Sequence, residues 1–523
     1  MVFAAQPLDV LELARQYFQA GDLDRAALLF AQVLQTHPEQ LGALNGLGVV
    51  AFQRQEFATA AEWFTRALAV EPHSAKVQTN LGNALMALEQ LEEALVCYQK
   101  AIALDADFAL AHFNLANLLV RQEQFAEAMA EYRHTVALKP DFLEAHLRLA
   151  GILRNLGKMD EEVAVYRDAI ALNPEMAELH NELGDALESQ GEWEAAACCY
   201  REAIRLWPDW AEAHCNYASL LMLRGDLRAG LAESEWRWQT PLFLKSERTF
   251  GKPAWDGSDL AGKRILVRAE QGFGDMIQFV RFASLLKARG ATVIFESYAP
   301  LLSLLSSYSG IDELVLCGAP LPPYDLHAAM MSLPLLLDVG TTLETIPAQV
   351  PYLYSPARCK LPLELQAALS APAPLKVGIV WAPALRFSID YQRYCPLEHF
   401  ESLLKTPGVA FFSLYKGERT TELAPYGERI VDVGTHCTDF ADTAWAIDRL
   451  DLVITVDTAA AHLAGALGKP VWLLLSFVPD WRWLLERTDS PWYPTACLFR
   501  QPAPGDWAAV LASAAATLRM ASS

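Results

Sequence analysis

The chain has 523 residues, of which 53% are hydrophobic and 20% charged, and its formal net charge is −21. It is too long for one ordinary domain and too apolar to be disordered. The acidic excess is uneven, because residues 1–242 hold 18 basic and 35 acidic residues, whereas residues 243–523 hold 24 and 28. A chain this acidic is a poor partner for nucleic acid, whose phosphates require clustered Lys and Arg.

No stretch of the sequence approaches the 18 consecutive apolar residues that suggest a membrane span. The first residues, MVFAAQPLDVLELARQ, lack a basic start and are interrupted by Asp9 and Glu12, so no signal peptide is expected. The nine cysteines contain no CxxC pair, which favours reduced thiols. These features predict a cytoplasmic protein.

The N-terminal half repeats with a period of 34 residues. Prolines recur at this spacing at Pro38, Pro72, Pro140, Pro174 and Pro208. Small residues follow ten positions later and large aromatics 26 positions later, at Gly48, Gly82, Ala116, Ala150, Gly184, Phe64, Tyr98, Tyr132, Tyr166 and Tyr200. Helix-turn-helix units of this period resemble tetratricopeptide repeats. We expect an α-solenoid over residues 1–242, with six full repeats and a degenerate seventh, and a connector over residues 243–261.

Asparagines recur at the positions expected to face the concave groove of the solenoid, namely Asn80, Asn83, Asn114, Asn117 and Asn216. An Asn amide both donates and accepts hydrogen bonds, so a file of them can hold a peptide backbone. The pattern resembles the asparagine ladder of O-linked N-acetylglucosamine transferase, which also carries such repeats before its catalytic region. The alternative is that these residues only solvate an exposed helix face.

From residue 263 the pattern changes to short apolar runs alternating with helical segments. The expected strands are residues 263–269, 291–298, 313–318, 375–382, 409–416, 450–457 and 470–475. Alternating strands and helices predict an α/β region with parallel, doubly wound sheets. We expect two Rossmann-like lobes, at 262–355 and 375–523, with an interlobe linker at 356–374 and a C-terminal helix in the second lobe.

The first loop of chemical interest joins the first expected strand to a helix, and it reads Glu270-Gln271-Gly272-Phe273-Gly274-Asp275. Its glycines allow close backbone approach. Asp275 is either the cap of the helix or a carboxylate that accepts a proton from an acceptor hydroxyl. The residues alone leave both interpretations open.

The second loop, residues 456–465, also joins a strand to a helix. The free N–H groups at the helix start, with the Thr458 hydroxyl, are suited to a phosphate. His462 either donates to the ligand or packs in the core. Lys416 and Arg393 are candidate cations for a diphosphate.

Two motifs carry a further resemblance. QGFGD at 271–275 and VDTAAAHLAGALGKPVW at 456–472 look like those of heptosyltransferase-type glycosyltransferases of the two-lobed GT-B fold. The resemblance implies that Asp275 is the catalytic base, in an acceptor loop with Gln271, Gly272 and Gly274. It also implies a donor-phosphate loop of Asp457, Thr458, Ala459, Ala460 and His462, with Lys416 on a phosphate. Residues 381–385 depart from the usual Trp-Ala-Gly-Asn-Pro, because they read Trp-Ala-Pro-Ala-Leu.

Together these features predict a glycosyltransferase that moves a sugar from a nucleotide-sugar donor to a hydroxyl of a protein bound by the repeats, with inversion. We expect no metal, because the C-terminal half has no Asp-x-Asp and no zinc-type spacing. No cofactor is expected besides the nucleotide-diphosphate sugar as co-substrate. Flagellin is one candidate acceptor, by analogy with repeat-bearing flagellin glycosyltransferases. The alternatives are a non-catalytic repeat scaffold and a lipopolysaccharide heptosyltransferase-like enzyme. The sugar, the nucleoside and the oligomeric state stay open.

Overall fold

The computed structural model describes residues 7–244, 250–270, 272–383 and 392–522. Gln271 of the expected acceptor loop, and Ala384 and Leu385 of the departing segment, therefore lie outside the described residues. The chain divides into two compact units, Met1–Ala186 and Leu187–Ser523. This division falls inside a repeat helix and not at residue 242, where the sequence places the end of the repeats.

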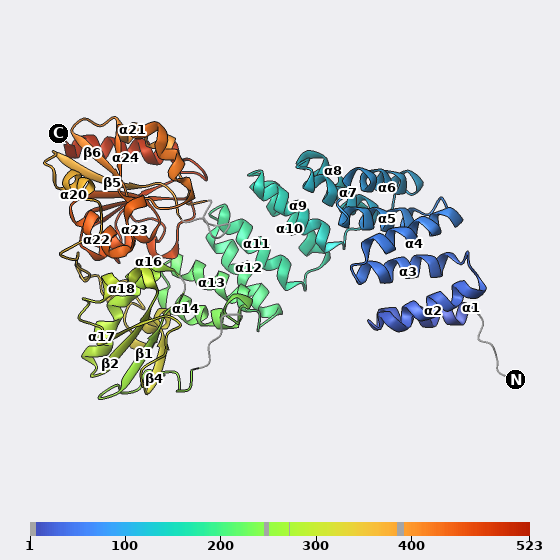
Figure 1. Cartoon of the computed structure of the whole chain (residues 1–523), viewed down its shortest axis with the longest axis horizontal. Coiled ribbons are helices and arrows are strands. Elements are labelled where there is room, and N and C mark those ends of the chain that lie inside the picture. The colour runs from blue at the N-terminus through green and yellow to red at the C-terminus, as the bar shows by residue number, and fades with distance from the viewer. Residues whose placement is uncertain (1–6, 245–249, 271, 384–391, 523) are drawn as a thin grey trace. The chain divides into compact units, whose positions relative to one another are not determined.

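The N-terminal region is a series of paired antiparallel helices (Figure 1). The first unit contains α1 (Pro7–Gln19), α2 (Leu23–Thr36), α3 (Leu41–Gln53), α4 (Phe57–Val70), α5 (Ala75–Ala87), α6 (Leu91–Leu104), α7 (Ala109–Arg121), α8 (Phe125–Leu138), α9 (Leu143–Asn155) and α10 (Met159–Leu172). Helix α11 (Ala177–Ser189) crosses the division, and α12 (Trp193–Leu206), α13 (Ala211–Leu223) and α14 (Leu227–Glu233) belong to the second unit. The prediction of a helical solenoid is confirmed.

The small and aromatic repeat positions meet as the sequence predicts. A Cβ added to Gly48 would lie 2.4 Å from the Phe64 ring, and one added to Gly82 would lie 2.5 Å from the Tyr98 ring. Phe64 and Tyr98 are almost fully buried. The missing side chain on one helix therefore makes room for the ring of its partner, and the 34-residue period follows from this contact.

The second unit contains two parallel β-sheets. The first has the order β3-β2-β1-β4. Its strands are β1 (Arg264–Arg268), β2 (Thr292–Ser297), β3 (Glu313–Leu316) and β4 (Leu326–Ala329). The second has the order β10-β9-β8-β5-β6-β7. Its strands are β5 (Leu375–Val380), β6 (Val409–Ser413), β7 (Ile430–Asp432), β8 (Leu452–Val456), β9 (Val471–Leu475) and β10 (Ala496–Arg500).

All strand pairs within the two sheets are parallel, which confirms the predicted α/β architecture. All seven expected strands are present, but β4, β7 and β10 were missed. Two of these, β4 and β7, have only four and three residues. Such short runs give little hydrophobic periodicity.

Apart from α24, which has 16 residues, the helices described in the α/β region have nine residues or fewer. They are α15 (Pro241–Leu244), α16 (Phe273–Phe279), α17 (Ala283–Ala288), α18 (Ala299–Leu305), α19 (Leu333–Leu337), α20 (Leu363–Ser370), α21 (Glu401–Leu404), α22 (Phe440–Asp448), α23 (Ala459–Ala466) and α24 (Trp507–Ser522). The helix expected after the first loop is interrupted by a 3₁₀ turn, η2 (Val280–Phe282), between α16 and α17. Within the described part of the chain, the helices all fall short of the length and hydrophobicity that a membrane span requires.

Inside the second unit, the last repeat helices pack directly on the α/β region. Helix α13 contacts the 3₁₀ turn η9 (Trp481–Trp483), and α14 contacts α19. A Cβ added to Gly191, just before α12, would lie 3.2 Å from the Phe477 ring. These contacts explain why the division into units precedes the end of the repeats.

Candidate functional site

Each sheet has a topological switch point beside its first strand. In the first sheet the chain leaves β1 towards β2 and later returns to the other side of β1 with β4. In the second sheet, β6 and β8 flank β5 in the same way. Ligands of such sheets bind beyond the carboxyl ends of the strands at these points. Both switch points open into cavities.

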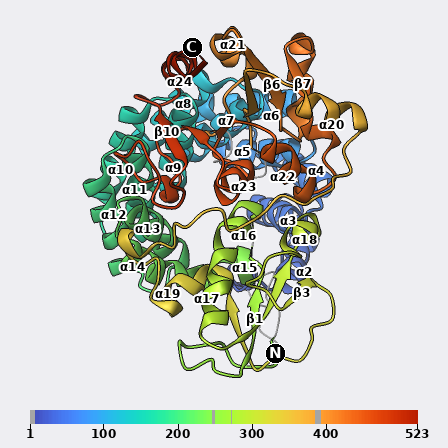
Figure 2. The ribbon, with the colours of Figure 1, turned by 90° about the vertical axis from the view of Figure 1, so that its left-hand side faces the viewer.

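The larger cavity, of about 1110 Å³, lies among loops from both sheets, and we call it the cleft cavity. Helices α16 and α23, which follow β1 and β8, lie side by side (Figure 2). Residues at the start of each helix line the cavity. Among the predicted site residues, those that line the cavity are Gly272, Gly274, Arg393, Lys416, Asp457, Thr458, Ala459 and Ala460. The structure therefore brings the two predicted loops and both candidate cations to one space.

Asp275 lies in the first turn of α16 and is not its cap. The cap is Gly272, whose φ of 95° is in the left-handed region that glycine tolerates. A Cβ added to Gly272 would lie 2.2 Å from Asp275 Oδ2. The glycine thus allows the backbone to approach the carboxylate closely.

The Asp275 carboxylate is held in an unusual electrostatic setting. Its Oδ1 accepts a hydrogen bond from Arg482 Nη2 at 2.5 Å. Burial raises the pKa of Asp275 to about 6, although Arg482 acts in the opposite direction. The carboxylates of Asp480, Glu270 and Asp457 add to the rise.

Arg393 joins two further carboxylates beside the cavity. Its guanidinium lies 3.5 Å from Asp457 Oδ2 and 3.5 Å from Asp480 Oδ2. Burial raises the pKa of Asp457. Burial acts in the same sense on Asp480, but Arg482 and Arg393 outweigh it and lower the pKa of Asp480 to about 2.

Thr458 begins helix α23. It occupies the cap position, makes no side-chain capping bond, and its Oγ1 lies 3.0 Å from Thr455 Oγ1. The first N–H groups of a helix have no partner within it and carry a partial positive charge. Since Ala459 and Ala460 line the cavity, this helix start is suited to an anion.

His462 is buried behind the helix start and does not line the cavity. Its Nδ1 lies 2.9 Å from the Tyr493 hydroxyl, and its ring stacks on Trp483. Burial lowers the pKa of His462 to about 3, so the ring is neutral at physiological pH. A Cβ added to Gly274 would lie only 2.8 Å from His462 Cδ2. The histidine thus occupies a packing position between α16 and α23.

Lys416 follows β6 and is exposed at the cavity. Its Nζ donates to the Cys437 carbonyl oxygen at 2.5 Å. The ammonium is therefore oriented by the backbone that precedes α22.

Sequence reasoning missed five residues that belong to this site: Arg482, Asp480, Thr438, Asp439 and Tyr298. The PDWRWLL segment contains Asp480 and Arg482, and its charges within an aromatic run were the available signal. The signal for Asp439 was its position before an apolar helical run, because its side chain caps α22 by accepting from Ala441 N and Asp442 N.

A second cavity, of about 830 Å³, lies at the switch point of the first sheet. Tyr298 lines both this cavity and the cleft cavity. The walls of the second cavity include Arg268, whose guanidinium is held between the Trp238 and Phe250 rings at 4.7 Å from each. Space for a second ligand group therefore adjoins the Asp275 loop.

The groove asparagines of the first unit bond to one another and to the repeat tyrosines. Asn80 donates to Asn45 at 2.9 Å, and Asn114 donates to Asn83 at 2.8 Å. The Tyr98 hydroxyl donates to Asn83, and the Tyr132 hydroxyl donates to Asn117. Asn45 was missed because it lies one position out of phase with the others. Asn216 lies in α13, in the second unit.

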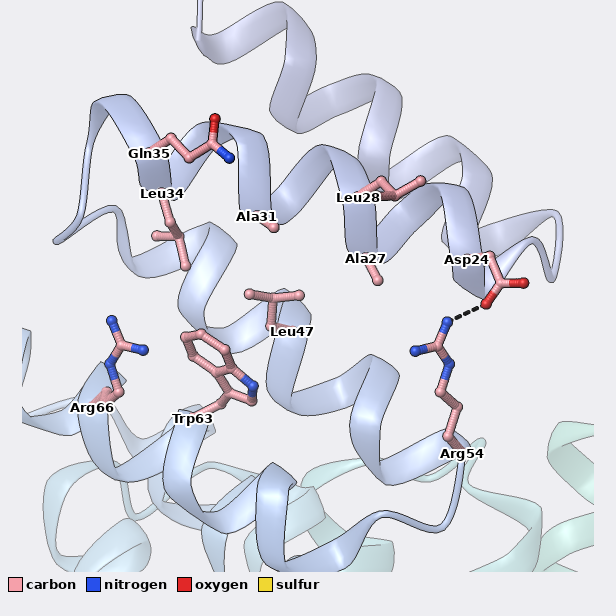
Figure 3. A pocket seen from close by; sticks show the side chains of 10 residues that line it. All are labelled: Asp24, Ala27, Leu28, Ala31, Leu34, Gln35, Leu47, Arg54, Trp63 and Arg66. Atoms are coloured by element: carbon pink, nitrogen blue, oxygen red, sulfur yellow. Dashed lines mark hydrogen bonds and ion pairs between the residues drawn. The ribbon is translucent and has the colours of Figure 1, made fainter.

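A third cavity, of about 720 Å³, lies in the first unit between α2, α3 and α4. Leu34, Leu47 and Trp63 point into it, and an ion pair between Arg54 and Asp24 lies at one end (Figure 3). Most of its lining comes from the second helices of two repeats, whereas the asparagines lie on first helices.

Two family models match the chain. The TPR repeat model matches residues 82–123, and the tetratricopeptide repeat model matches residues 11–75, 113–177, 163–209 and 181–233. A curated relative, Protein FlbA of Caulobacter vibrioides, is 28% identical in a match 331 residues long that covers 58% of this chain and 54% of FlbA. The chain thus spans about half the length of that relative.

Several solved structures are similar to part of the chain. PilW, described as a type IV pilus biogenesis factor, has 22% identity and a TM-score of 0.35, over 40% of this chain and 97% of PilW. PilF of Pseudomonas aeruginosa has 20% identity and a TM-score of 0.34, over 39% and 92%. YrrB, described as a TPR protein with an unusual peptide-binding site, has 21% identity and a TM-score of 0.29, over 35% and 95%. From the family models and the helix pairs, the N-terminal part of this chain is a tetratricopeptide-repeat solenoid.

Proposed function

We propose that this chain is a glycosyltransferase that transfers a sugar from a nucleotide-sugar donor to a hydroxyl of a protein bound by its repeats. The observation that carries the proposal is the cleft cavity, where Arg393, Lys416 and the start of α23 lie together. Asp275 does not line this cavity itself, but it directly follows the lining residues Gly272 to Gly274 and is held by Arg482. Two parallel sheets that share one cavity are the architecture expected of a GT-B enzyme.

The donor would bind on the side of the second sheet. The start of α23 offers N–H groups and the Thr458 hydroxyl to the phosphates, and Arg393 and Lys416 offer positive charge. These groups stabilise the nucleoside diphosphate as it departs, which is electrostatic catalysis by a preorganised site. His462 has a supporting role in this proposal, because it fixes the distance between α16 and α23.

Asp275 is the proposed general base. Its pKa of about 6 leaves it ionised at neutral pH while making it a stronger base than an ordinary carboxylate. It would take the proton from the acceptor hydroxyl as the oxygen attacks the anomeric carbon. The bond to the diphosphate then breaks, with inversion, in one displacement that calls for no metal or cofactor.

The acceptor is proposed to be a protein, with flagellin as one candidate, and the reaction is assigned to the cytoplasm. The repeat solenoid supports a protein acceptor, since such arrays present an extended groove to partners. YrrB, a similar repeat protein, is described as having a peptide-binding site. The groove amides of Asn83 and Asn114 are preorganised by their mutual hydrogen bond.

A scaffold that binds a nucleotide without catalysis is the second candidate. Two observations favour it: Arg482 already occupies one oxygen of Asp275, and Lys416 already donates to a backbone carbonyl. In that case the cavity would still bind a nucleoside diphosphate, but Asp275 would be structural.

The two candidates separate in one experiment. The chain is screened by thermal shift against nucleoside diphosphates and nucleotide sugars, because a ligand of the folded state raises the melting temperature. Turnover of the best sugar nucleotide is then compared between the wild type and Asp275→Asn. The transferase predicts a shift, and turnover that falls by at least about 100-fold in the variant. A shift with no turnover supports the scaffold, and no shift with any nucleotide refutes both.

A further inference from the structure

Arg482 holds the Asp275 carboxylate from the other sheet of the second unit. The side chain belongs to η9 and is buried, with 5% of its surface exposed. Its Nη2 donates to Asp275 Oδ1 at 2.5 Å, and its Nε donates to Gln278 Oε1 at 2.5 Å. One guanidinium thus fixes two side chains of α16, so the orientation of this helix depends on η9.

Asp480 holds the other edge of the same guanidinium. Its Oδ1 accepts from Arg482 Nη1 at 2.8 Å and from the Arg482 backbone N–H at 3.0 Å. Its Oδ2 lies 3.5 Å from Arg393, which in turn lies 3.5 Å from Asp457. Charges of alternating sign therefore run without a break from Asp275 to the loop that begins α23.

We propose that Arg482 is a positioning residue for Asp275: it fixes the carboxylate beside the cleft cavity and, through Asp480 and Arg393, joins it to Asp457 at the donor side. The inference rests on the proposed function, because it supplies a partner for the base of that reaction. The ion-pair chain itself is measurable without any substrate.

Charge balance makes Arg482 decisive for the protonation of Asp275. Burial is the largest influence and favours the neutral carboxyl. Within the described residues, the charged and titratable groups that act on it or pack against its helix turn are Arg482, Asp480, Glu270, Asp457 and His462. The histidine is neutral and the three carboxylates raise the pKa of Asp275, so Arg482 is the cation that opposes them.

This arrangement links donor binding to the strength of the base. A diphosphate at the start of α23 adds negative charge to the same chain and competes with Asp457 and Asp480 for Arg393. Both effects raise the proton affinity of Asp275. Asp275 thus becomes the stronger base when the donor is in place, which favours a donor-first order of binding.

The test measures the protonation of Asp275 through stability. Melting temperatures of the full chain and of its Asp275→Asn variant are compared from pH 4.5 to 9, because asparagine cannot titrate. Since the folded pKa of Asp275 is raised, the full chain gains stability relative to the variant as pH falls, and loses it as pH rises through about 6. A linkage fit of this difference, with the unfolded pKa of an aspartate fixed at about 3.9, gives the midpoint of the Asp275 titration in the folded chain, which is its folded pKa.

The midpoint is then measured in three further backgrounds. In Arg482→Gln it should move up by about 1 to 3 pH units, because the opposing cation is removed. In Asp480→Asn it should move down, because a neighbouring carboxylate is removed. In Arg482→Lys the charge is kept, and the midpoint should stay close to 6.

Opposite movements from two adjacent residues are not expected of a general packing role. An unchanged midpoint in Arg482→Gln, or a midpoint that rises in Asp480→Asn, overturns the proposal. If Arg482→Gln does not fold, Asp480→Asn and Arg482→Lys still decide. A wild type that turns over no nucleotide sugar refutes the proposed function, yet leaves these midpoints as a separate result. If the acid limb of the pH profile of turnover does not move with the midpoint in these variants, the positioning role of Arg482 in catalysis is refuted.

Discussion

Gly274→Ala should destabilise the second unit, because α16 and α23 approach too closely for a side chain at this position. The new Cβ would lie 2.8 Å from His462 Cδ2, 3.4 Å from His462 Nε2 and 3.6 Å from Ala459 Cα. Carbon atoms in contact prefer a separation of about 3.5–4.0 Å, so the ring or the helix must move by more than about half an ångström. The ring cannot move freely, since it is stacked on Trp483 and bonded to the Tyr493 hydroxyl.

The net effect is the difference between two terms. Overpacking in a core costs about 1–3 kcal/mol. Replacing a helical glycine by alanine stabilises by about 0.5–1 kcal/mol. We therefore expect a loss of up to about 2.5 kcal/mol in Gly274→Ala. The control is Gly427→Ala, where the backbone is also in the right-handed helical region and nothing lies within 4 Å of the new Cβ. That variant should be neutral or stabilised by less than about 1 kcal/mol.

Tryptophan fluorescence is the appropriate assay. Of the 14 tryptophans, only Trp63 lies in the first unit, so the signal reports almost entirely on the second. Unfolding in urea is followed at pH 7.5 for the wild type and the two variants. A Gly274→Ala variant as stable as Gly427→Ala would show that α16 and α23 are not packed as the structure has them.

Three further predictions concern the ligand sites. Thr458→Val keeps the shape of the side chain but removes its hydroxyl, and should weaken binding of the nucleoside diphosphate by about 10- to 100-fold in calorimetry, as expected for a hydrogen bond to a charged group; unchanged affinity would remove the hydroxyl from the site. Lys416→Ala should weaken the same binding and reduce its dependence on salt concentration, since an exposed cation acts through screened charge; an unaltered salt dependence would place the diphosphate elsewhere. The double variant Asn83→Ala with Asn114→Ala should reduce capture of an acceptor peptide at least about 5-fold. The control variant Asn173→Ala, which removes an amide bonded to a helix-end carbonyl, should not reduce it. If the double variant captures as much peptide as the control, the groove asparagines only solvate the surface.

The sequence revealed the repeats and the strands because their signals are local or periodic. The contact of Gly82 with Tyr98 recurs one period earlier between Gly48 and Phe64, and the same small and aromatic positions repeat along the sequence, so the period of 34 was visible without a structure. The apolar runs of β5 and β8 were visible for the same reason, since strands buried on both faces are continuous hydrophobic stretches.

The contacts that complete the candidate site span the chain and have no local signal. Arg482 lies 207 residues from Asp275, and only the fold brings the two together. The sequence also left the role of His462 open, because a histidine one turn into the helix after β8 can face either way. In the structure the His462 ring is buried and bonded to the Tyr493 hydroxyl, so it faces the core.

The contact between α13 and η9 constrains how such a chain can change in evolution. Whole repeats could be gained or lost before residue 187 without disturbing η9, because each repeat of a solenoid touches only its neighbours. An insertion within α12 to α14 would instead displace the support of the turn that carries Arg482. The number of repeats before residue 187 can therefore vary with the partner that is bound. The last repeat, in contrast, must be kept together with the site of the proposed reaction.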